Sequence, residues 1–248
     1  MDKVVLVTGG SRGIGAALAQ QAAAQGWSVA VNYTRDAAAA DNVVQAVRSC
    51  GVRALAVQAD VADEAQVLRM FGQVDAQLGR LDALVNNAGV VDRAARLDQM
   101  DLARLRRMFD INLLGSFVCA REAVRRMSTR HGGRGGVIVN LSSAAARLGG
   151  AGQYIDYAAT KGAIDSFTLG LAREVAAEGI RVNAVRPGII ETEIHASGGQ
   201  PDRARELAPM VPMQRAGSAD EVAAAILWLM SDASSYTTGA LIDVTGGR

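Results

Sequence analysis

Residues 4–15 of the chain read VVLVTGGSRGIG, an apolar run that leads directly into a glycine-rich turn. Val4, Val5 and Val7 are β-branched, so the run predicts a buried strand. The alanine-rich segment at residues 16–25 predicts a helix, with Gly26 as its C-terminal stop. A strand, a glycine turn and a helix in this order indicate a site for dinucleotide phosphates, because the N–H groups at a helix start bind anions. A glycine turn of an ordinary α/β domain is the alternative for this stretch taken alone.

Tyr157 and Lys161 form the second informative pattern. They stand four residues apart in a segment that predicts a helix, so their side chains share one face. Of the four tyrosines, only Tyr157 has a lysine four residues further on. A cation beside a phenol favours the phenolate, so we expect Lys161 to lower the pKa of Tyr157 below its usual value near ~10. The pair predicts a proton donor and acceptor that works at neutral pH.

Short β-rich runs alternate with longer helical segments along the chain. The runs lie at residues 4–7, 29–31, 54–58, 83–85, 137–141, 181–185 and 241–244. Strands separated by helices pair in parallel, because the chain must cross over between them. The sequence therefore predicts one α/β domain over residues 1–248, a doubly wound, seven-stranded parallel sheet of Rossmann type in a three-layer α/β/α arrangement. The long connection at residues 193–217 departs from this pattern, and we expect it to form a substrate lid.

Composition and charge exclude several classes of function. The chain has 248 residues and a formal net charge of +1, with acids and bases interspersed, so no basic face argues for nucleic acid. Cys50 and Cys119 make no disulfide framework, and His131 and His195 are far apart, so we expect no metal site. There is no signal peptide and no apolar run near ~18 residues, so we expect a soluble cytoplasmic protein with no membrane partner.

Further short motifs follow the predicted strands. Asp60-Val61 follows the third, Asn86-Asn87-Ala88-Gly89 the fourth, Ser142-Ser143 the fifth and Pro187-Gly188-Ile189-Ile190-Glu191-Thr192 the sixth, while Asn112 lies in a long helix. Together with the Gly9-x-x-x-Gly13-x-Gly15 spacing and the Tyr157–Lys161 pair, this order resembles the short-chain dehydrogenase/reductase family from Lys3 to the C-terminus. The chain is most similar to its branch of 3-oxoacyl-carrier-protein reductases and glucose 1-dehydrogenase-like enzymes.

The resemblance implies hydride transfer between a nicotinamide cofactor and a small-molecule carbonyl or alcohol. It makes Tyr157 the general acid and base, while Lys161 bonds the nicotinamide ribose and Asn112 holds a water for proton resupply. Ser143 would orient the substrate oxygen; Ser142 is the alternative, because the spacing to Tyr157 is one residue longer than is usual in the family. The residues that the resemblance and the motifs assign to the cofactor are Gly9, Ser11, Arg12, Gly13, Ile14, Gly15, Asn32, Arg35, Asp60, Val61, Asn87, Ala88, Gly89, Tyr157, Lys161, Pro187, Gly188, Ile190 and Thr192.

The end of the second strand bears on the form of the cofactor. A site for NAD(H) places Asp or Glu there, bonded to the ribose hydroxyls. Here the strand ends at Asn32, and no carboxylate appears until Asp36. Arg12 and Arg35 could instead flank a 2′-phosphate, although both could also be solvated surface residues. We therefore expect NADP(H) to be preferred over NAD(H).

Residues 101–127 predict one long helix that is apolar on more than one face. One stripe holds Leu102, Leu105, Phe109, Leu113 and Phe117, and another holds Met108, Ile111, Leu114 and Val118. One face can cover the sheet and the other needs a different cover, for which a homotetramer is the economical answer. A cofactor-binding sensor or scaffold without turnover is the alternative function. The substrate cannot be identified from the sequence.

Overall fold

Seven parallel strands form one sheet in the order β3-β2-β1-β4-β5-β6-β7 in the computed structural model, which describes residues 3–248 apart from the side chain of His195. The strands are β1 (Val4–Val7), β2 (Ser28–Tyr33), β3 (Ala54–Gln58), β4 (Ala83–Asn86), β5 (Gly136–Leu141), β6 (Ile180–Pro187) and β7 (Leu241–Val244). Register is regular throughout: Val5 of β1 lies between Val29 of β2 and Ala83 of β4. The predicted α/β Rossmann-type sheet is confirmed, and each predicted run lies inside an observed strand.

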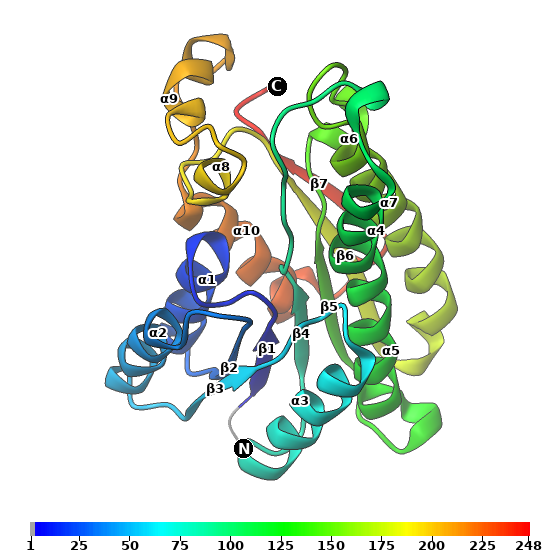
Figure 1. The fold of residues 1–248 in the computed structure, drawn as a ribbon. Coiled ribbons are helices and arrows are strands. Elements are labelled where there is room, and N and C mark those ends of the chain that lie inside the picture. The colour runs from blue at the N-terminus through cyan, green and yellow to red at the C-terminus, as the bar shows by residue number, and fades with distance from the viewer. Residues whose placement is uncertain (1–2) are drawn as a thin grey trace.

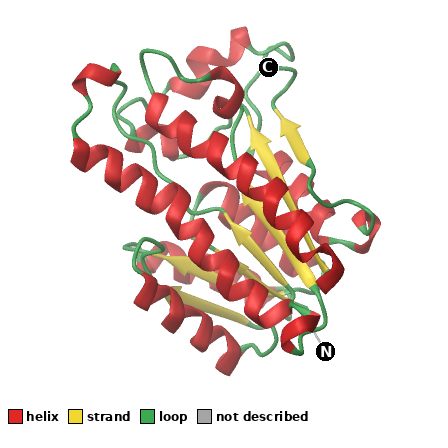
Figure 2. Cartoon of the chain, turned by 90° about the vertical axis from the view of Figure 1, so that its right-hand side faces the viewer, coloured by secondary structure: helices red, strands yellow, loops and turns green. Residues whose placement is uncertain are grey.

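Helices cover both faces of the sheet (Figures 1 and 2). The helices are α1 (Gly13–Ala24), α2 (Ala37–Ser49), α3 (Glu64–Gln77), α4 (Leu102–Phe109), α5 (Gly115–Met127), α6 (Ala145–Leu148), α7 (Ile155–Val175), α8 (Ile194–Ser197), α9 (Arg203–Leu207) and α10 (Ala219–Met230). In Figure 1, α1, α2 and α10 lie on one face, and α3, α4, α5 and α7 on the other. None of the described helices is both long and apolar enough to span a membrane.

Two apolar cores flank the sheet because successive strand residues point to opposite faces. Val5 and Val7 of β1 pack into the core under α1, α2 and α10. Val4 and Leu6 pack into the core under α3, α5 and α7. Burial on both faces explains why β1 is a continuous apolar run rather than an alternating one.

The long helix expected at residues 101–127 is interrupted. Helices α4 and α5 are joined by one π-helical turn at Asp110–Leu114. The extra residue of a π turn shifts the helical phase, and such turns are frequent at functional sites. Here it places Asn112 in the interior, where the side chain is buried.

Helix α4 is fixed to the start of α7 by a buried ion pair. Arg104 Nε lies 2.8 Å from Asp156 Oδ2, and the Asp156 side chain is fully buried. Arg104 also donates from Nη1 to the Arg93 carbonyl oxygen at 2.7 Å. The other carboxylate oxygen, Asp156 Oδ1, accepts from the backbone N–H of Tyr157 at 2.9 Å. One guanidinium therefore connects α4, the loop at Arg93 and the turn that presents Tyr157.

The Arg104→Ala variant should lose about 3–5 kcal/mol of unfolding free energy, because it leaves the Asp156 carboxylate buried and unpaired. Arg106→Ala is the matched control, since Arg106 lies two residues further along α4 and is exposed. Its effect should stay within about 0.5 kcal/mol. Urea unfolding followed by circular dichroism measures both, and equal losses in the two variants would show that the pair does not stabilise the fold.

Candidate active site

The carboxyl ends of the parallel strands meet at one edge of the sheet. Sequence order reverses between β1 and β4, and ligands of open α/β sheets bind outside the strand ends at such a switch point. The loops that follow β1, β4, β5 and β6 all lie at this edge. They carry the glycine turn, Asn87, Ser143 and Gly188, so the predicted motifs come together there.

The glycine turn fits an anionic phosphate group. Gly9 and Gly13 have φ values of +60° and +52°, a region that side chains other than glycine rarely adopt. Helix α1 starts at Gly13, and its N-cap Arg12 makes no side-chain capping bond. No acidic residue lies in the first turn of α1 itself, and the nearest carboxylate comes from Glu193, whose Oε2 would lie 3.5 Å from a Cβ on Gly13. The third glycine, Gly15, is required by packing within the protein, because a Cβ at this position would lie 2.6 Å from the Gly9 carbonyl oxygen.

Two of the predicted cofactor residues brace the loop from within the protein. Asn32 is buried, accepts from the Gly9 N–H at 3.1 Å and donates to the Ala59 carbonyl at 3.0 Å. Asn87 donates to the carbonyl oxygens of Thr8 and Gly9, each at 2.9 Å. The structure thus gives the Asn32 side chain a role that the sequence does not indicate, because its polar atoms are used inside the protein.

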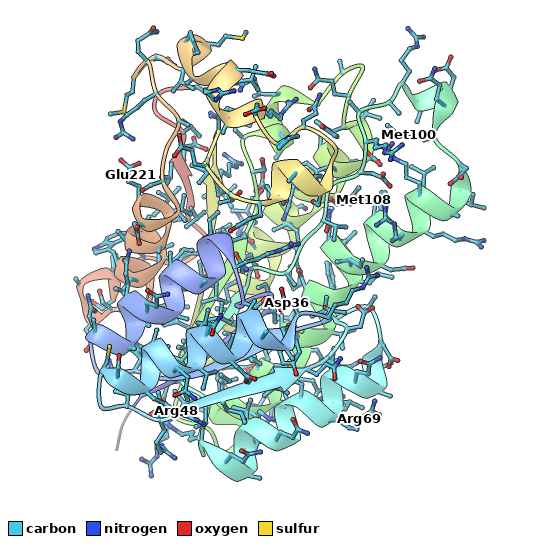
Figure 3. The ribbon with its side chains drawn as sticks, turned by 60° about the vertical axis from the view of Figure 1, so that its left-hand side comes forward. Asp36, Arg48, Arg69, Met100, Met108 and Glu221 are labelled. Carbon is cyan, nitrogen blue, oxygen red and sulfur yellow. The ribbon has the colours of Figure 1, made fainter. Side chains whose placement is uncertain are left out.

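In the described part of the chain, the first carboxylate after β2 is that of Asp36, and it is used inside the protein. Asp36 stands at the start of α2 (Figure 3), and its side chain caps that helix by accepting from the Ala39 N–H at 2.9 Å. Arg12 and Arg35 are exposed and make no ion pair within the described residues. On the next loop, Asp60 accepts from the Ala62 N–H at 3.0 Å, and Val61 is buried against Gly115.

Tyr157 and Ser143 line one cavity of about 420 Å³. Ser142 is not available to it, because this side chain is buried and donates to the Lys161 carbonyl oxygen at 3.1 Å. Lys161 is buried behind the tyrosine, with Nζ 5.6 Å from the Tyr157 ring centroid. The ammonium donates to the Leu141 carbonyl at the end of β5 at 2.5 Å. Of the two serines, the geometry therefore favours Ser143 as the one that can reach a substrate in the cavity.

The pKa of Tyr157 differs from the expectation of a lowered value. Burial raises the pKa of the Tyr157 phenol, and a hydrogen bond with Ser143 acts in the opposite direction. Burial lowers the pKa of Lys161 to about 8, with the Asp165 carboxylate opposing that shift. Loss of solvation disfavours the charged form of both groups, and the ammonium bonds a carbonyl rather than the phenol. The net shift of the Tyr157 pKa in this structure is therefore upward, opposite to the expected direction.

Asn112 and Gly89 complete the interior wall beside Lys161. Asn112 accepts from the Val90 N–H at 2.8 Å and donates to the Val90 carbonyl at 2.9 Å. A Cβ on Gly89 would lie 3.4 Å from Asn112 Oδ1 and 3.7 Å from Lys161 Nζ. The loop after β4 is thus held against the π turn, and the three residues lie close together.

The segment after β6 closes the site from the other side. Gly188 packs against Thr245, and a Cβ on Gly188 would lie 2.8 Å from Thr245 Cα. Ile190 is buried and pairs in parallel with Gly217. A Cβ on Gly13 would lie 3.4 Å from the Thr192 methyl carbon, which places Thr192 at the start of α1. The start of α1 and the segment from Pro187 to Thr192 are therefore neighbours.

Some residues around the site have no clear sequence signal. Asp156 reads as an ordinary acidic residue in the first turn of a helix, and nothing in the sequence connects it with Arg104. Gln153 and Gln200 are also unremarked in sequence, yet each accepts from the Arg203 guanidinium. Within the described residues, no group of three or more His, Cys, Asp or Glu side chains could hold a metal ion.

Comparison with known sequences agrees with this geometry. Residues 9–248 match the family described as enoyl-(acyl carrier protein) reductase. The chain is 52% identical to the uncharacterized oxidoreductase YgfF of Escherichia coli, with 99% of each chain covered. It is 40% identical to a cis-4-hydroxycyclohexanecarboxylate dehydrogenase of Sinomonas cyclohexanicum, over 99% of this chain and 96% of that protein.

Solved structures of oxidoreductases are also similar to this chain over nearly its whole length. A short-chain type dehydrogenase/reductase of Mycobacterium marinum superposes with a TM-score of 0.92 at 35% identity, over 99% of this chain and 94% of that one. A 3-ketoacyl-(acyl-carrier-protein) reductase of Brucella melitensis, in complex with NADH, gives a TM-score of 0.91 at 31% identity, with 99% and 98% covered. The chain belongs to the short-chain dehydrogenase/reductase family of oxidoreductases.

Proposed function

We propose that the protein transfers a hydride between NADP(H) and a carbonyl or secondary alcohol substrate, with Tyr157 as the general acid and base. One observation carries the proposal: Tyr157 and Ser143 face one cavity, and the ammonium of Lys161 is buried directly behind them. The glycine turn and the start of α1, whose N-cap residue makes no side-chain capping bond, lie at the same edge and support the dinucleotide part of the assignment.

When bound, the nicotinamide supplies the hydride in reduction and takes it up in oxidation. Tyr157 keeps its proton at neutral pH because burial raises its pKa, so it can donate to a substrate oxygen that gains negative charge. Ser143 can donate a hydrogen bond to the same oxygen. A charged Lys161 stabilises the phenolate that remains. The protonated form of Tyr157 is the one that reduction needs at its start, so we propose reduction as the direction of the reaction.

Lys161 and Asn112 act from the interior. A lysine pKa of about 8 leaves the ammonium charged at neutral pH and lets it lose a proton with little cost. We assign to Asn112 the proton-resupply role that the family resemblance implies, because it lies against the loop that contacts Lys161. In the same way, Thr192 is proposed to orient the nicotinamide carboxamide together with the backbone of Ile190, since Thr192 lies beside the start of α1.

The charges around the end of β2 support the proposed preference for NADP(H). Asp36 caps α2, so its carboxylate is engaged away from a ribose. Arg12 and Arg35 offer two guanidinium groups that have no carboxylate partner within the described residues, and a guanidinium pairs well with phosphate.

The outer face of α4 and α5 supports the proposal of a homotetramer. Leu102, Leu114 and Phe117 are 60%, 52% and 43% exposed. The Phe117 ring also stacks on Phe167 of α7 with centroids 3.8 Å apart, so the apolar surface continues onto that helix. Apolar surface of this extent marks a contact site, and a second copy of the chain is the cover that we propose. The cytoplasmic location stays a prediction.

The Tyr157→Phe variant should lose about 10²- to 10⁴-fold in kcat, because the substrate oxygen loses its proton donor. Its affinity for NADPH, measured by fluorescence titration, should change by less than about threefold, since the other residues assigned to the cofactor are unchanged. Turnover is followed by nicotinamide absorbance with a panel of ketones, 3-oxoacyl thioesters, sugars and quinones.

Tyr154→Phe is the matched control for Tyr157→Phe. Tyr154 lines the same cavity three residues earlier, and its hydroxyl donates to Gln200 at 2.8 Å. It should retain turnover within about tenfold of the wild type. Equal losses in the two variants would contradict the role of Tyr157, as would cofactor binding without turnover of any panel member.

Cofactor preference is tested with Arg12→Ala and Arg35→Ala. The wild type should show at least a tenfold higher kcat/KM with NADPH than with NADH. Each variant should lower this ratio by roughly tenfold, because a hydrogen bond to a charged group contributes about 1.5–3 kcal/mol. Arg69→Ala in α3, an exposed arginine (Figure 3), should leave the ratio unchanged. A wild type that prefers NADH tenfold would contradict the assignment.

A further inference from the structure

The cavity beside Tyr157 has two walls of different origin. Ser143, Tyr154 and Tyr157 form one wall, and the segment after β6 contributes Ile194 and Arg203 to the other. Figure 1 shows this arrangement at the level of the helices, with α6 and the start of α7 facing α8 and α9 across the C-terminal end of the chain. The rest of the cavity wall is mostly apolar and includes Val91, Leu148 and Ile189. None of the described residues that line the cavity is Asp or Glu, and Arg248 lines it as a second arginine.

Arg203 is held in place by neutral groups. Its Nη1 donates to Gln200 Oε1 at 2.8 Å, and its Nη2 donates to Gln153 Oε1 at 2.9 Å. The guanidinium carbon lies 5.0 Å from the centroid of the Tyr154 ring. Tyr154 in turn donates to Gln200, so the amide is fixed from two sides. These contacts orient the guanidinium, but they do not neutralise its charge.

The lack of a counter-ion distinguishes Arg203 from nearby arginines. Arg205, two residues further on, pairs with Asp202 at 2.9 Å. Arg215 pairs with Glu221 at 2.6 Å. For Arg203 no carboxylate lies within ion-pair distance in the described part of the chain. A guanidinium has five N–H donors, and the two amides use two of them, so donors remain for a ligand.

We propose that the substrate is a carbonyl compound, or the matching alcohol, that also carries a carboxylate, and that Arg203 binds this carboxylate. The inference rests on the proposed function, because it places the carbonyl at Tyr157 and Ser143. A planar guanidinium with free donors suits a planar carboxylate, since two parallel hydrogen bonds can form. The cavity, at about 420 Å³ and with apolar walls, suits a small organic acid whose carbon skeleton separates the two polar ends.

Matched acid and ester pairs test the inference. The probes are 4-oxocyclohexanecarboxylate and 5-oxohexanoate, each compared with its methyl ester under reduction by NADPH. For a pair that is turned over, the acid should have at least a tenfold higher kcat/KM than the ester, expressed mainly in KM. Arg203→Gln should lower the kcat/KM of the acid by roughly ten- to hundredfold and that of the ester much less, so that the preference disappears.

Two further variants separate charge from structure. Arg203→Lys keeps the positive charge and should retain part of the preference for the acid. Arg205→Gln, on the same helix and paired with Asp202, should leave the preference unchanged. An ester turned over as efficiently as its acid by the wild type overturns the carboxylate inference and leaves the reductase assignment intact. Turnover of neither member of either pair, together with none of the wider ketone panel, would count against the reductase itself.

Discussion

Burial of the Lys161 ammonium is the constraint on which the site depends. A pKa lowered from 10.5 to about 8 corresponds to roughly 3 kcal/mol of unfavourable free energy at neutral pH. Because the unfolded chain binds more protons between these two values, this cost is fully present below pH 8 and disappears above pH 10.5. The Leu141 carbonyl compensates part of it. A fold that stabilises a charged lysine at this cost places the cation beside the only aromatic hydroxyl that shares its helical face.

The rest of the architecture holds that helix face at the sheet edge. Strand β5 ends at the carbonyl that binds Lys161, and the following residue, Ser142, bonds the lysine backbone. The ion pair between Arg104 and Asp156 fixes the turn directly before Tyr157. Asn112 fixes the loop after β4 against the same group of residues. Polar contacts of this kind are directional, so they set the orientation of side chains that apolar packing alone would leave free.

The fold and much of the candidate site could be predicted from the sequence, for physical reasons. The residues of β1 are apolar on both faces, and the glycine turn has few conformations available, so the fold and the phosphate loop follow from local pattern. The break in the helix at Asp110 does not follow, because residues 101–127 are apolar on more than one face, and this hides the phase shift that a π turn introduces. The direction of the Tyr157 pKa shift was predicted wrongly, since it depends on how deeply both groups are desolvated. The bonds from Arg104 to Asp156 and from Arg203 to Gln153 join residues about 50 positions apart, so they depend on tertiary packing and have no local signal.

The most direct test is a measurement of the Lys161 pKa in the enzyme alone. The chain has only two lysines, Lys3 and Lys161, so protein labelled with carbon-13 and nitrogen-15 in lysine should give two side-chain signals. A Lys161→Met variant identifies the signal of Lys161. The structure predicts that this signal titrates with a pKa of about 8. A Lys161 signal that stays in its charged position through pH 10 would contradict the account, because the ammonium would then not be desolvated beside Tyr157.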